Sequence, residues 1–78
     1  DETAVIFNQL CKEAKRRGYE TVAFIWYDGS DIGDVVGWRA FINTASADTP
    51  ALWAPGAYET PYDALAILHG IVTQPLDR

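Results

Sequence analysis

The type of apolar patterning changes twice along this chain, and that change limits the folds open to it. Between residues 3 and 17 apolar side chains recur every three or four positions, as on one face of an amphipathic helix. Residues 20–27 and 35–43 are instead rich in β-branched and aromatic side chains, which is typical of strands. Helical spacing returns after residue 61. The pattern predicts helix, strand, strand and helix in that order.

The ends of both helices carry recognisable signals. Gly18 follows the first helical stripe and supplies the left-handed conformation that commonly ends a helix. Thr60 is a typical N-cap residue, and Pro61 stands where the missing backbone N–H costs nothing. Asp63 adds an acid to the first turn. A second helix is therefore expected to begin at residue 61 and to end near 69–73, before Pro75.

The two strands are expected to form an antiparallel hairpin joined by the turn at residues 28–34. Both faces of the 20–27 strand are largely apolar, which predicts a central strand with a helix on one face and at least partial cover on the other. A third, edge strand is expected near residues 51–54, because Pro50 and Pro55 fit the limits that proline imposes on strands.

These elements predict an α+β fold, in which a small antiparallel sheet carries both helices on one face as a two-layer sandwich. One domain is expected to occupy residues 1–78. The order resembles that of the double-stranded-RNA-binding fold, but such domains begin their second helix with basic residues, where this chain has Thr60-Pro61-Tyr62-Asp63. The core is expected to contain the rings of Phe7, Phe24, Trp26 and Phe41.

The net charge of −5 is unevenly distributed. Residues 12–17 hold four basic residues and one acid, for +3, whereas the rest of the chain holds two basic and ten acidic residues, for −8. An acidic body repels phosphate backbones, so direct nucleic-acid binding is not expected. The longest apolar run, Val22 to Tyr27, is far shorter than the roughly 20 residues of a membrane helix.

Ten aromatic residues are more than a core of this size can enclose. The surplus rings are therefore expected at the surface, where large amphipathic side chains beside acids resemble the composition of protein-binding hot spots. We expect Trp53, Tyr58 and Tyr62 to form such a cluster near the start of the second helix.

The 28–34 turn contains three acids, Asp28, Asp31 and Asp34. Their spacing does not match a calcium loop, because Ser30 occupies the third position and Arg39 the twelfth. No metal or other cofactor is therefore predicted, and the three acids are interpreted as an anionic patch for a basic partner.

The conventional nucleophile and base of the chain, Cys11 and His69, belong to different predicted helices, and no catalytic motif accompanies them. We therefore expect a non-enzymatic interaction module. A single cysteine and the lack of a leading signal segment favour the cytoplasm.

The expected partner is another protein or a second copy of the chain. One alternative is an acidic inhibitor that mimics phosphates toward nucleic-acid-handling machinery, of the type found in phages and mobile elements. A second alternative is a weak metal-binding protein or a Cys/His enzyme.

Overall fold

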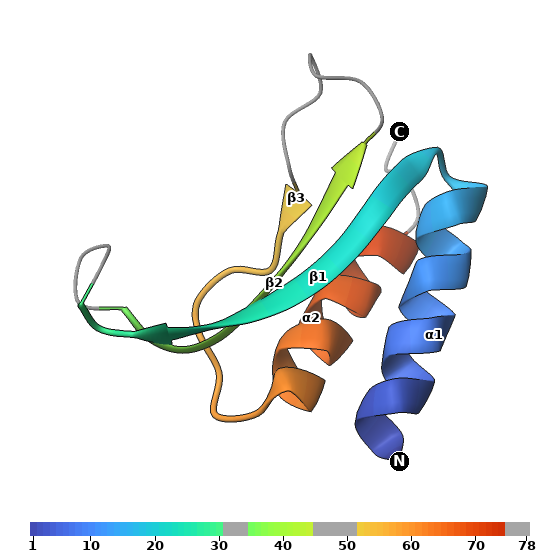
Figure 1. Ribbon diagram of the computed structural model, residues 1–78. Helices are drawn as coiled ribbons and strands as arrows, with labels where there is room; N and C mark the ends of the chain where they lie inside the picture. Colours follow the sequence, from blue (N-terminus) through green and yellow to red (C-terminus); the bar gives the residue numbers. More distant parts are fainter. Residues whose placement is uncertain (31–34, 45–51, 75–78) are drawn as a thin grey trace.

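The computed structural model describes residues 1–30, 35–44 and 52–74. Its elements are α1 (Glu2–Arg16), β1 (Tyr19–Asp28), β2 (Val36–Thr44), β3 (Leu52–Trp53) and α2 (Pro61–Thr73). The three strands form one antiparallel sheet, and both helices lie on the same side of it (Figure 1). The predicted α+β fold and the predicted order of elements are confirmed.

Both helices begin at capped residues. The Asp1 carboxylate accepts a hydrogen bond from the backbone N–H of Ala4 at 2.9 Å. At the start of α2, the Thr60 hydroxyl oxygen accepts one from the backbone N–H of Asp63 at 3.1 Å, and Pro61 is the first helical residue. The start of α2 therefore lies where the Thr-Pro-Tyr-Asp signal predicts it.

Replacing Thr60 with alanine is expected to lower the free energy of unfolding by about 1 kcal/mol, because the Asp63 N–H loses its acceptor. Urea denaturation measures the change. Thr60→Ser keeps a hydroxyl at the same position and should retain most of the stability. Equal losses in the two variants would show that the hydroxyl does not cap α2.

The strand order is β1-β2-β3, so β2 is the central strand. The expectation that the 20–27 strand is central is wrong: β1 lies at an edge of the sheet. β2 pairs with β1 over most of its length and with β3 through Phe41–Trp53 and Ile42–Leu52. The apolar second face of β1 was the reason for expecting a central strand, and in the described chain no helix or strand lies over that face (Figure 1).

The buried core is aliphatic. It consists of residues from α1, β2, the segment after β3 and α2: Leu10, Ala14, Ala40, Ile42, Ala54, Ala64, Leu65, Leu68 and Val72. Alanines on β2 and α2 leave room for the helix to lie close to the sheet. The core therefore forms where small and branched side chains interdigitate.

The aromatic core expected from the sequence is only partly correct. Phe7 and Phe24 pack against the buried cluster and meet edge to face, with ring centroids 5.7 Å apart. Trp26 is 52% exposed, because the end of the β1–β2 hairpin extends beyond the helices (Figure 1). Phe41 points to the opposite face of the sheet from the buried Ala40 and Ile42.

Candidate functional site

One face of the sheet carries the helices, and the other face is uncovered in the part of the chain that the structure describes. Successive side chains of a strand point to opposite faces, so the neighbours of the buried Ala40 and Ile42 point away from the helices. Directly paired residues share a face, which extends the set to β1 and β3. This surface, called the open face below, comprises Thr21, Ala23, Ile25, Tyr27, Arg39, Phe41, Asn43 and Trp53.

Arg39 lies at the centre of the open face between aromatic rings of the two edge strands. Its guanidinium carbon is 4.6 Å from the ring centroid of Trp53 and 5.9 Å from that of Tyr27, both within the range of cation–π attraction. The Phe41 and Trp53 rings are stacked, with centroids 4.7 Å apart and planes 28° apart. The three strands therefore hold one cation and three rings in a fixed arrangement.

The open face exposes large apolar side chains to solvent. Ile25 is 38% exposed and Trp53 is 36% exposed, while Tyr27, Arg39 and Phe41 are half-buried. The Nε atom of Arg39 is buried and has no hydrogen-bond partner among the residues that the structure describes. Because burial removes water from a donor, this N–H has lost its hydration without gaining an acceptor in the described part of the chain.

Tyr58, one of the three aromatic residues expected to form a surface cluster, contacts the protein interior. Its backbone N–H and C=O pair with those of Trp38 at 2.9 and 2.7 Å, and its hydroxyl donates to the carbonyl oxygen of Pro55. Its ring packs against the buried cluster. Tyr58 thus holds the segment after β3 against the central strand, β2, through backbone hydrogen bonds.

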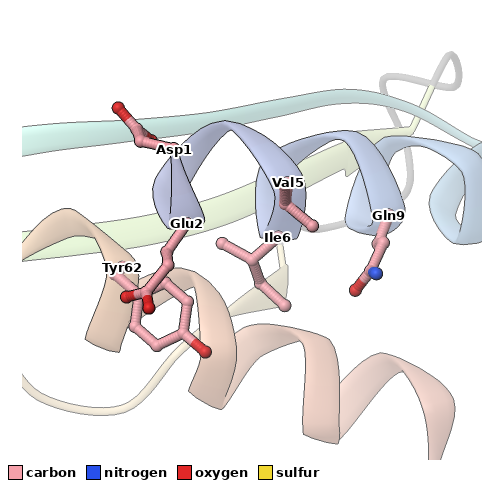
Figure 2. A pocket seen from close by; sticks show the side chains of 6 residues that line it. All are labelled: Asp1, Glu2, Val5, Ile6, Gln9 and Tyr62. Carbon is pink, nitrogen blue, oxygen red and sulfur yellow. The ribbon is translucent and has the colours of Figure 1, made fainter.

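Tyr62 lies on a different surface from Trp53. It lines a shallow groove of about 510 Å³ between the first turns of α1 and α2, together with Asp1, Glu2, Val5, Ile6 and Gln9 (Figure 2). Trp53 points away from the helix layer because it pairs with Phe41. The structure therefore does not bring Trp53 and Tyr62 into one cluster.

Asp28 is the member of the predicted acidic patch that the structure describes; Asp31 and Asp34 lie outside the described residues. The Asp28 carboxylate accepts hydrogen bonds from the Ser30 hydroxyl at 2.6 Å and the Ser30 backbone N–H at 2.9 Å. These hydrogen bonds lower the pKa of Asp28 below its ordinary value. Among the described residues no group of three potential metal ligands comes together.

Cys11 is half-buried on α1, and burial raises the pKa of its thiol. A raised pKa disfavours the thiolate, which is the nucleophilic form. His69 lies on α2, and its backbone carbonyl accepts a hydrogen bond from the Thr73 hydroxyl at 2.8 Å.

Neither helix, within its described length, is long and apolar enough to cross a membrane.

Tyr27 and Trp53 were among the surplus aromatic residues expected at the surface, whereas Phe41 was expected in the core and Arg39 was not expected in the site. The available signal was the second apolar face of the strands, which was interpreted as covered. A lone arginine among the apolar residues of β2 was a further sign, since a charged side chain rarely points into a dry interface without a partner.

No protein family matches the chain, and neither a curated protein nor a solved structure is significantly similar to it. Its function must therefore be inferred from its own geometry.

Proposed function

We propose that this chain is a small, non-enzymatic interaction module of the cytoplasm that binds another protein through the open face of its sheet. The observation that supports this most directly is the group of Tyr27, Phe41 and Trp53 around Arg39 on the face that no described element covers. Tryptophan, tyrosine and arginine are the residues that most often dominate the energy of protein interfaces.

The position of these residues on paired strands favours tight binding. A side chain that is already stacked on its neighbours loses little rotamer freedom when a partner arrives. Phe41 and Trp53 stack on each other across β2 and β3, and Arg39 is held between two rings. The binding surface is thus largely formed before the partner arrives, and most of the contact energy is available for affinity.

Asp28 supplies a negative charge at the hairpin end of β1, close to the open face although its side chain points to the same side of the sheet as that of Trp26. It is the last residue of β1, the strand that also provides Ile25 and Tyr27. A charged carboxylate at the rim of an apolar patch affects how quickly and in which orientation a partner docks more than how tightly it binds. Replacing Asp28 should accordingly change association rates more than dissociation rates.

Two tryptophans on opposite faces of the sheet allow a matched test. Trp53 lies on the open face and Trp26 on the helix side, where it is the more exposed of the two. Partners are to be captured from native lysate with wild-type protein, Trp53→Ala and Trp26→Ala, and quantified by mass spectrometry. Trp53→Ala should reduce recovery of the specific partner by about tenfold or more, whereas Trp26→Ala should leave it largely unchanged.

Thermal unfolding of both variants establishes that they remain folded. If every captured protein were recovered equally by the Trp53→Ala variant and the wild type, the open face would not be the binding surface. If partners were lost only with Trp26→Ala, the interface would instead lie on the helix side of the β1–β2 hairpin.

A further inference from the structure

Resting on the proposed function, we infer that Arg39 recognises a carboxylate of the partner: the open face binds a protein segment in which an Asp or Glu side chain is flanked by apolar residues. The carboxylate would meet the guanidinium between the rings of Tyr27 and Trp53, and the apolar neighbours would contact Ile25 and Phe41.

The first support is the state of the Arg39 guanidinium. Its Nε atom is already buried without an acceptor, and Arg39 forms no ion pair with any residue that the structure describes. By contrast, Arg16 and Arg17 both donate to the Glu13 carboxylate. Because part of the desolvation of Arg39 has occurred on folding, a carboxylate that docks there loses less of the binding energy to removing water.

The second support is geometric. The planar guanidinium presents several donors in a fork that matches the two oxygens of a carboxylate. Cation–π contacts with Trp53 and Tyr27 restrict where that fork can point. The same rings exclude water around the ion pair, which strengthens the attraction between the two charges.

The charges of the chain identify the kind of occupant. Among the described residues the open face contains Arg39 and no acidic residue, and Asp28 points to the helix side, so these residues of a second copy docked face to face would offer Arg39 no carboxylate. On the open face a nucleic acid would meet a single cation, Arg39, and the net charge of the chain is −5. Phosphate backbones are instead bound by several cations at once. A peptide segment of another protein, with one carboxylate and apolar neighbours, fits both features.

A displayed library of random linear peptides, selected on the full-length wild-type protein, provides the probes. The selected peptides are expected to be enriched in Asp or Glu next to apolar residues. For the tightest peptide, changing that Asp to Asn or Glu to Gln should weaken binding to wild-type protein about tenfold or more. The same change should have little effect on binding to Arg39→Gln, because that variant has already lost the ion pair.

Arg39→Lys serves as the second variant, since it retains the charge but not the fork. It should bind the acidic peptide more tightly than Arg39→Gln and less tightly than the wild type. Circular dichroism and thermal unfolding show whether each variant is folded, and Trp26→Ala is the control for changes elsewhere on the sheet.

The alternative outcomes separate this inference from the proposed function. Neutral peptides that depend on Trp53 but bind Arg39→Gln as well as the wild type would overturn the carboxylate site and leave the open face as the binding surface. Peptides that are indifferent to both Trp53→Ala and Arg39→Gln would overturn both proposals. Tighter, Arg39-dependent binding of a 12-nucleotide oligothymidine probe would replace the peptide partner with single-stranded nucleic acid.

Discussion

Gly37→Ala is expected to be one of the two most destabilising single substitutions considered for this chain. Gly37 has a φ of +129°, a conformation that side-chain-bearing residues rarely adopt. An added Cβ would lie 2.9 Å from the carbonyl oxygen of Tyr58 and 3.0 Å from the Cβ of Ala57. Backbone strain and overpacking each cost about 1–3 kcal/mol, so the free energy of unfolding should fall by about 2–6 kcal/mol.

The clash falls on a segment that cannot easily move. Trp38, the next residue of β2, exchanges two backbone hydrogen bonds with Tyr58, and Tyr58 packs against the core. Displacing the 57–58 segment would therefore break the bridge that fixes the chain between β3 and α2. The loss should be visible in urea denaturation as a lower midpoint with little change in slope.

Gly70→Ala is the matched control. Gly70 lies within α2 and has no φ in the left-handed region, and an added Cβ there meets no atom within 4 Å. Because alanine is a better helix former than glycine, this variant should be more stable by about 0.5–1 kcal/mol. A Gly37→Ala variant as stable as the wild type would contradict the close approach of β2 and the 57–58 segment.

The helices and strands could be predicted closely because their signals are local. The Thr60-Pro61 pair marks the start of α2 to the residue, and Gly18, with a φ of +91°, follows α1 as expected. The predicted third strand at residues 51–54 is observed as Leu52–Trp53. Caps, turn residues and apolar periodicity act over a few neighbouring residues, so a single sequence contains them.

Strand order could not be predicted in the same way, because it depends on contacts between distant residues. A strand with two apolar faces has the same pattern whether its second face is covered by another layer or left open. β1 was therefore expected at the centre of the sheet, although β2 lies there. The open face became recognisable only when pairing placed Ala23 opposite Phe41 and Ile25 opposite Arg39.

The candidate site shows the same limit. Trp53 and Tyr62 are nine positions apart and were expected on one surface, but the chain passes from the sheet layer to the helix layer between them. Tyr62 consequently lies beside α1, whereas Trp53 stacks on Phe41 across the sheet. Proximity along the sequence did not predict which side chains share a surface. The two layers separate Trp53 from Tyr62, whereas strand pairing brings Tyr27, Arg39 and Trp53 together.

Leu68→Ala is expected to lower the free energy of unfolding by about 2–5 kcal/mol, because Leu68 is fully buried and its removal leaves a cavity among packed side chains. A domain of this size has a free energy of unfolding of about 4–12 kcal/mol in total, so the Leu68→Ala variant loses a large part of it and should unfold at a lower temperature. Ile67 precedes it in α2 but is 42% exposed, and Ile67→Ala should cost about 1 kcal/mol or less. Equal losses would contradict the observed orientation of α2. Leu68 lies in the helix layer, and the open face lies on the other side of the sheet. Leu68→Ala should therefore reduce partner binding only in proportion to the fraction of unfolded molecules. Trp53→Ala, by contrast, should weaken partner binding even when all of the protein is folded.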